Sequence, residues 1–172
     1  MVIWILGKSG SGKSYIAKKI FNLLEKKYKK VFWIDGDEFR KFFSKDLKYS
    51  IRDRKKNSDR MRQLCAYLEK KNYIVICSIL SIFKDHQKEN RNLFNNYYQI
   101  FIKANQKTIS RMDVKGVYKQ KINVVGKDLK FPTPYKSDMI LKNNFNNKNK
   151  KNIDKIVNEI QKFISKNNKS II

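Results

Sequence analysis

Five short segments of the chain are predicted to be buried strands, and they alternate with segments whose apolar residues recur at helical spacing. The strand segments are Val2–Leu6, Val31–Ile34, Tyr73–Cys77, Gln99–Lys103 and Asp138–Leu141. Val31–Ile34 is apolar at every position, as expected of a strand that is buried on both faces. Strands that alternate with helices predict right-handed βαβ units and therefore an α/β fold with a parallel sheet.

Apolar residues three and four positions apart predict the helices. The predicted helices are Ile16–Leu24, a short stretch with Phe39, Phe42 and Phe43 as its apolar face, a longer one with Met61, Leu64, Cys65 and Leu68, then Asp85–Phe94, a short segment ending near Met112, and a C-terminal helix at about 151–167. The segments without such a pattern are interpreted as a polar loop, a strand exit and a linker, at Lys45–Ser58, Ser78–Phe83 and Asn143–Lys151.

Residues 113–134 lack periodicity and gather glycines, prolines and lysines. Because a segment of this length without regular structure is usually functional, it is either a lid over a ligand site or a long surface loop. The chain has 172 residues, 41% of them hydrophobic, which suits one domain with a substantial core. We find no internal repeat, so the prediction is a single domain over residues 1–172.

The formal net charge of +25 invites a nucleic-acid interpretation. The lysines, however, are spread along the whole chain, and aromatic residues do not alternate with basic ones as in a strand-binding platform. We therefore expect a basic surface that attracts small anionic molecules, with no specific nucleic-acid partner.

Cysteine, histidine and hydropathy exclude several other classes. Cys65 and Cys77 lie in segments predicted to be buried and are interpreted as reduced core thiols, and His86 as a surface helix residue. No Cys/His spacing matches a zinc site. The longest apolar run, Tyr73–Phe83, is too short to span a bilayer, and no secretion signal is recognisable. The expectation is a cytoplasmic protein without a membrane partner.

The strongest motif follows the first strand directly. Its eight residues match G-x-x-x-x-G-K-[ST], the phosphate-binding loop, at every fixed position: Gly7, Lys8, Ser9, Gly10, Ser11, Gly12, Lys13 and Ser14. Glycines let successive backbone N–H groups point at phosphate oxygens, and the following helix N-terminus favours negative charge. Lys13 is predicted to reach the β- and γ-phosphates, and the Ser14 hydroxyl to ligate Mg²⁺. The loop indicates a nucleoside triphosphate without distinguishing a GTPase, an ATPase or a kinase.

Two carboxylates follow the second predicted strand. Asp35 and Asp37 stand at its carboxyl end, where open parallel sheets place their ligands. One carboxylate there can hold Mg²⁺ and the other can accept a hydroxyl proton. The alternative is an Asp-Gly turn followed by a helix N-cap, and the pattern alone leaves both open.

Arginines and an asparagine come next, at Arg40, Arg54, Asn57 and Arg60. Each one alone fits a solvated surface. Together, beside a phosphate loop, they favour an anionic acceptor, because arginine pairs with phosphate or sulfate through two parallel hydrogen bonds.

Five ordered blocks now carry a resemblance to a known family. They are GKSGSGKS at residues 7–14, DGDEFR at 35–40, KDLKYSIRDRKKN at 45–57, SILSIF at 78–83 and RMDVKGVY at 111–118. The chain resembles adenylyl-sulfate kinases, which transfer the γ-phosphoryl group of ATP to the 3′-hydroxyl of adenylyl sulfate. The resemblance covers about Val2–Leu141 and implies a P-loop kinase fold with helices on both faces of the sheet, a lid at about 113–134, and ATP with Mg²⁺ as cofactors.

The resemblance also implies roles for individual residues. Asp37 would orient or deprotonate the acceptor hydroxyl, with Lys13 and Asp35 completing the catalytic set and Ser14 and Asp35 holding the metal. Arg111 is assigned to the ATP side. The residues assigned to the acceptor, besides Asp37, are Arg40, Tyr49, Arg54, Asn57, Ile79, Leu80, Ser81, Lys115, Gly116 and Val124. Members of the family are often dimers, so a homodimer is an expectation of the same origin.

The chain departs from the family pattern on the acceptor side. Ile82 replaces a proline, the lid is shorter, and Val124 stands where the family has a second base-stacking phenylalanine. Losing one stacking partner costs about 1–3 kcal/mol per base, enough to alter base preference without excluding adenine. Short relatives that phosphorylate the same ribose position of cytidine diphosphoramidate, associated with bacterial capsule loci, give an alternative acceptor.

Two further alternatives draw on less of the sequence. A polynucleotide or nucleoside kinase would explain the charge, and a nucleotide-responsive binding protein would explain the phosphate loop. Neither explains DGDEFR together with RMDVKGVY.

Overall fold

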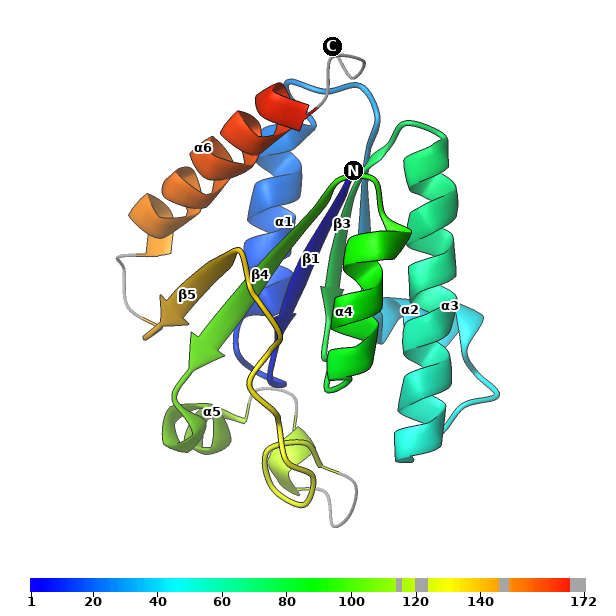
Figure 1. Cartoon of the computed structure of the whole chain (residues 1–172). Helices are drawn as coiled ribbons and strands as arrows, with labels where there is room; N and C mark the ends of the chain where they lie inside the picture. The colour runs from blue at the N-terminus through cyan, green and yellow to red at the C-terminus, as the bar shows by residue number, and fades with distance from the viewer. Residues whose placement is uncertain (114–115, 120–123, 146–148, 168–172) are drawn as a thin grey trace.

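The computed structural model describes residues 1–113, 116–119, 124–145 and 149–167. Their strands form a five-stranded parallel sheet in the order β2-β3-β1-β4-β5 (Figure 1). The strands are β1 (Val2–Gly7), β2 (Val31–Asp35), β3 (Ile74–Ile79), β4 (Tyr97–Ala104) and β5 (Met139–Asn143). The predicted α/β architecture with a parallel sheet is therefore confirmed.

Helices cover both faces of this sheet. They are α1 (Lys13–Leu24), α2 (Gly36–Phe43), α3 (Ile51–Lys70), α4 (Lys84–Leu93), α5 (Gln106–Met112) and α6 (Asn149–Asn167). In Figure 1, α1 and α6 lie on one side of the sheet and α3 and α4 on the other. The strand arrowheads point toward the end of the molecule that carries α5 and the loop around residues 124–131.

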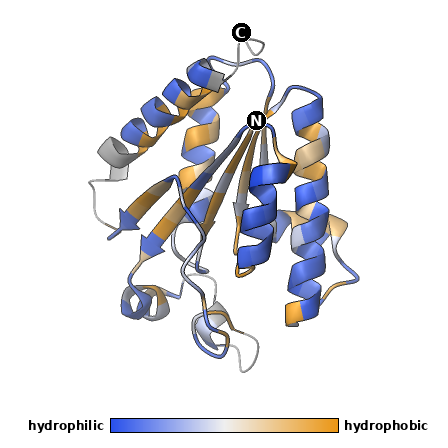
Figure 2. Cartoon of the chain, in the orientation of Figure 1, coloured by the Kyte–Doolittle hydropathy of each residue, from blue (hydrophilic) through white to orange (hydrophobic). Residues whose placement is uncertain are grey.

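Alternating residues of the strands supply two hydrophobic cores, because successive side chains of a strand point to opposite faces. Ile3 and Ile5 of β1 belong to the core under α1 and α6, whereas Val2, Trp4 and Leu6 belong to the core under α3. All five are fully buried. Figure 2 shows the corresponding hydrophobic stripes on the inward sides of the helices.

Strand β2 corrects one prediction. It is an edge strand that pairs only with β3 in the described sheet, and the Phe32 side chain is 44% exposed. An apolar run is therefore not proof of burial on both faces here, because only the strand order decides which strand lies at the edge.

The prediction that Lys45–Ser58 is a loop is wrong for its second half. Helix α3 begins at Ile51, and the Ser50 side chain caps it by accepting a hydrogen bond from the Asp53 backbone N–H at 3.1 Å. The first turns carry few apolar residues, so helical periodicity does not reveal them. Similarly, β3 continues through Ser78 and Ile79, which we expected in an exit loop, and α6 begins at Asn149.

Two predictions about single side chains are also wrong. All three phenylalanines of α2 were expected on its buried face. Phe42 and Phe43 are instead 66% and 64% exposed, and only Phe39 is buried. His86 is 2% exposed rather than on the surface. Its ring nitrogens lie 3.0 Å from the Ser58 hydroxyl and 3.2 Å from the Asp59 carboxylate, and these partners offset the cost of its burial.

Cys65 and Cys77 are free and buried, as predicted. In the part of the chain that the structure describes, no helix has the length and hydropathy needed to cross a bilayer.

Candidate active site

The phosphate loop joins β1 to α1 at the carboxyl edge of the sheet. Gly10 and Gly12 have φ angles of 71° and 91°, a left-handed conformation that side chains with a Cβ rarely adopt. The Lys13 ammonium folds back over the loop and donates to the Lys8 carbonyl at 2.7 Å. The sequence motif thus adopts the compact turn that its glycines predict.

Asp35 connects this loop to the neighbouring strand pair. Its Oδ2 accepts hydrogen bonds from the hydroxyls of Ser14 at 2.5 Å and Ser78 at 3.0 Å. Its Oδ1 accepts from the backbone N–H groups of Asp37 at 3.0 Å and Glu38 at 3.3 Å, which caps α2. Asp35 therefore caps α2, as one of the two interpretations predicts, and it also contacts Ser14, the residue predicted to ligate Mg²⁺. The metal-binding and proton-accepting roles stay predictions.

The Asp35 carboxyl group is held in its ionised form. Burial by itself would raise its pKa, but the hydrogen bonds from Ser14, Ser78 and the α2 backbone outweigh burial, so that its pKa lies below the ordinary value. Hydroxyl and ionised carboxylate oxygens are the ligands that Mg²⁺ prefers. Among the described residues no group of three His, Cys, Asp or Glu side chains forms a metal cage.

The lowered pKa makes stability dependent on pH. A carboxyl group with a depressed folded-state pKa stabilises the fold above its unfolded pKa and loses this contribution as pH falls through the folded value. We expect Asp35→Asn to lower the Tm of the unliganded protein near neutral pH, and this difference to shrink below about pH 4. Thermal unfolding from about pH 7 to about pH 3 measures it. Glu38→Gln, an exposed carboxylate of the same helix, is the control, and a Tm difference independent of pH would contradict the prediction.

A cleft of about 640 Å³ extends from the phosphate loop to the beginning of α3. Ser9, Lys13 and Ser14 of the loop line it, as do Asp35 and Asp37 at the end of β2 and the start of α2. Arg40, Tyr49, Arg54, Leu80 and Val125 complete its other walls, together with Gly36, Lys41, Ser44, Lys45, Leu47 and Ser78. Donor and acceptor residues predicted from separate sequence blocks thus share one cavity.

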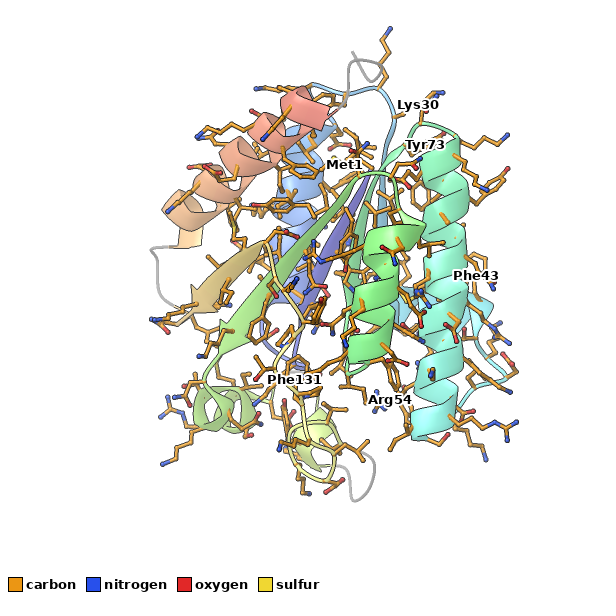
Figure 3. The ribbon with its side chains drawn as sticks, in the orientation of Figure 1. Met1, Lys30, Phe43, Arg54, Tyr73 and Phe131 are labelled. Carbon is orange, nitrogen blue, oxygen red and sulfur yellow. The ribbon has the colours of Figure 1, made fainter. Side chains whose placement is uncertain are left out.

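Two arginines converge on the Tyr49 ring in this cleft. The Arg40 and Arg54 guanidinium carbons lie 5.0 Å and 5.3 Å from the ring centroid. Arg40 also donates to the Lys48 carbonyl at 2.8 Å, and Arg54 to the Tyr49 carbonyl at 3.1 Å. Figure 3 shows Arg54 at the end of the molecule where the strands terminate, with Phe131 at the same end and Met1, Lys30 and Tyr73 at the opposite one.

Burial lowers the pKa of both guanidinium groups, and repulsion from Arg40 lowers that of Arg54 further. The Asp37 carboxylate opposes this shift at both arginines. The residues that line the cleft include five cationic side chains and only two carboxylates, an excess of positive charge that favours an anionic ligand: Lys13, Arg40, Lys41, Lys45 and Arg54 against Asp35 and Asp37.

Several predicted residues lie outside this cleft. Ile79 and Ser81 are 4% and 1% exposed and do not line it. Asn57 is buried, with its Nδ2 3.6 Å from the Met61 sulfur. Arg60 pairs with Asp46 through two bonds of 2.6 Å and 2.7 Å.

Among the described residues, no predicted site residue from position 111 onward lines this cleft. Arg111 lines a separate hollow of about 450 Å³ with Tyr118 and Lys127. Val124 and Val125 are 1% and 2% exposed, and only Val125 of the two lines the main cleft. Gly116 lines neither hollow, and Lys115 lies outside the described residues.

Sequence reasoning missed the polar residues at the far end of the cleft, Lys41, Ser44 and Lys45, and it selected Val124 instead of its neighbour. Val124 and Val125 are identical residues in a segment without periodicity, so the sequence does not tell which one lines the cleft. Asn143, which contacts the phosphate loop, carried no sequence signal.

Comparison with known proteins shows that the chain is similar to a family of kinases. The family model described as "Adenylylsulphate kinase" matches residues 1–142. A cytidine diphosphoramidate kinase of Campylobacter jejuni is 28% identical over 92% of this chain and 95% of its own length. An adenylyl-sulfate kinase of Thermodesulfovibrio yellowstonii is 36% identical over 70% of this chain, and the match covers 62% of that protein. The APS kinase of Mycobacterium tuberculosis, solved with AMPPNP and APS, superposes with a TM-score of 0.80 at 25% identity, over 95% of this chain and 96% of that one.

Proposed function

The chain belongs to the adenylylsulphate kinase family, and from that premise we propose that it transfers the γ-phosphoryl group of ATP to the 3′-hydroxyl of a nucleoside 5′-phosphate carrying a small anionic cap. The observation that carries the proposal is that one cleft is lined by Lys13 and Ser14 of the phosphate loop, by Asp37, and by the two arginines around Tyr49. A kinase needs the donor phosphates and the acceptor hydroxyl side by side, because in-line transfer depends on positioning.

In this proposal the acceptor 3′-oxygen attacks the γ-phosphorus, the bond to the bridging oxygen breaks, and ADP leaves. The hydroxyl proton passes to the Asp37 carboxylate or is oriented by it. Lys13 and the loop N–H groups stabilise the charge on the donor phosphates. Arg40 and Arg54 hold the anionic end of the acceptor.

Mg²⁺ belongs to the same proposal. Ser14 and Asp35 are the residues that would hold it, because their oxygens already face each other at 2.5 Å and Asp35 is ionised. When bound, the metal neutralises charge on the β- and γ-phosphates.

Adenylyl sulfate is the first candidate acceptor, and cytidine diphosphoramidate is the second. Two observations favour the second: the near full-length match to a cytidine diphosphoramidate kinase, and a cleft in which Tyr49 is the one aromatic residue among the described lining residues. Sulfate and phosphoramidate are both compact tetrahedral groups, so Arg40 and Arg54 suit either. The first acceptor would place the enzyme in sulfate assimilation, the second in capsule modification.

The decisive experiment measures ADP release from ATP and Mg²⁺ with each acceptor in turn. We expect turnover with at least one of them, and the ratio of the two kcat/KM values identifies the base. Arg54→Ala should raise the KM of the preferred acceptor by about tenfold, corresponding to about 1.4 kcal/mol of binding energy. Arg52→Ala is the matched control, since Arg52 is exposed and does not line the cleft. Absence of ADP release with both acceptors would overturn the proposal.

A further inference from the structure

Three carbonyl groups of the phosphate loop are hydrogen-bonded by side chains. The Lys8 carbonyl accepts from Lys13 Nζ at 2.7 Å, and the Ser9 carbonyl from the Tyr118 hydroxyl at 3.1 Å. The Ser11 carbonyl accepts from Asn143 Nδ2 at 2.9 Å, across 132 positions of sequence. The first of these donors, Lys13, belongs to the nucleotide-binding motif itself. Asn143 belongs to β5, which lies at an edge of the sheet.

Asn143 is held so that its amide can point only one way. It is the last residue of β5 and is 4% exposed. Its Oδ1 accepts a hydrogen bond from the Phe145 backbone N–H at 3.0 Å, which leaves the amide nitrogen directed at the loop. Pairing of Asn143 with Ala104 of β4 ties the backbone of this residue to the sheet.

The amide also fills the space beside Gly12. A Cβ atom added at Gly12 would lie 2.6 Å from Asn143 Nδ2, closer than van der Waals contact allows. Gly12 has a φ of 91°, so its conformation and its closeness to Asn143 both require glycine. The side chain of Asn143 therefore packs against the same peptide unit whose oxygen it binds.

The direction of a carbonyl determines the direction of the N–H in the same peptide unit. The described peptide bonds are all trans, and in a trans peptide the C=O and N–H point in opposite directions. Holding the Ser11 carbonyl toward Asn143 of β5 consequently turns the Gly12 N–H away from that side chain. Inward N–H groups are what such a loop presents to phosphate oxygens.

We propose that Asn143 is a positioning residue for the donor nucleotide, orienting the Gly12 N–H for phosphate through its hydrogen bond to the Ser11 carbonyl. The inference deepens the proposed function and rests on it only in requiring that the loop bind a nucleoside triphosphate. It concerns the donor and is independent of the acceptor.

The test is the affinity of the full-length protein for the ATP analogue AMPPNP with Mg²⁺, measured by isothermal titration calorimetry. Asn143→Ala should weaken binding by about tenfold, because one preoriented phosphate donor is lost. In the kinase assay, the KM for ATP should rise with it, whereas the KM for the acceptor should stay close to that of the parent. Asn144→Ala is the matched control, because Asn144 is exposed and adjacent.

A second variant separates positioning from packing. Asn143→Asp keeps the shape of the side chain and the acceptor for the Phe145 N–H, but it replaces the donor by an oxygen that repels the Ser11 carbonyl. It should weaken AMPPNP binding at least as much as the alanine variant, and it decides the question if Asn143→Ala does not fold. A purely structural role would instead lower the Tm and leave the affinity of the folded variants unchanged.

Affinities of both folded variants within twofold of the parent would overturn the inference. The parent protein keeps this outcome distinct from failure of the proposed function. If the parent binds AMPPNP but phosphorylates neither acceptor, the proposed function fails and the calorimetric comparison still decides the role of Asn143. A parent that does not bind AMPPNP would overturn both.

Discussion

Replacing Asp37 by asparagine is expected to lower kcat by about 10²–10⁴-fold, the usual contribution of a positioned general base, while the affinity for ATP stays nearly unchanged. Asp37 lines the same cleft as Lys13, Ser14, Arg40 and Arg54. The asparagine amide can still occupy this place, but it cannot take up the proton of the substrate 3′-hydroxyl. The loss should therefore fall on the chemical step.

Single-turnover ADP formation and calorimetric binding of AMPPNP together measure this effect. Glu38→Gln removes the same charge from the next residue of α2, which is exposed and does not line the cleft. This control should behave as the parent does, which excludes a general effect of charge at the helix N-terminus. Near-normal kcat in Asp37→Asn would refute the assigned role.

Lys13→Ala should reduce kcat/KM for ATP by about 10²–10³-fold, in the range found when one preorganised electrostatic donor is removed from an active site. In the structure the Lys13 ammonium lies over the phosphate loop and donates to the Lys8 carbonyl. ATP would displace this contact in favour of the β- and γ-phosphates, whose charge grows in the transition state. We expect both ATP binding and turnover to suffer, unlike in Asp37→Asn.

Initial rates over a range of ATP concentrations at saturating acceptor give the two parameters separately. Lys18→Ala is the control, because Lys18 is an exposed lysine of the same helix outside the cleft. A Lys13→Ala protein whose kcat/KM for ATP stays within a few-fold of the parent would contradict the role of the phosphate loop as the donor site.

The elements whose signals are local were predicted from the sequence. The phosphate loop is one, because Gly10 and Gly12 are needed for its left-handed backbone and the fixed lysine and serine follow them directly. Strands and helices with regular apolar periodicity were also found, since burial of one face imposes that period. The first turns of α3 were missed because a Ser50 cap, rather than an apolar face, begins this helix.

The cleft-lining residues that the sequence predicted belong to recognisable sequence motifs. DGDEFR predicted Asp35, Asp37 and Arg40 near the end of one strand, and all three line the cleft. Asn57 was grouped with the arginines and Val124 was assigned from the resemblance, and both are buried and do not line the cleft. Which of two neighbouring residues, such as Val124 and Val125, lines a cavity depends on the local backbone conformation, and the residue types alone do not reveal it.

The sequence by itself determined the α/β class, the phosphate loop and the carboxylates that follow the second strand. Each depends on interactions between residues that are close in the chain, so a short pattern suffices. Only the tertiary structure decided that β2 lies at the edge of the sheet, that His86 is buried, and that Asn143 of β5 contacts the phosphate loop. These follow from the strand order and from how helices pack on it, which bring together residues as distant in sequence as Ser11 and Asn143, 132 positions apart. No local pattern records such contacts, because their energy depends on a partner that the local sequence does not contain.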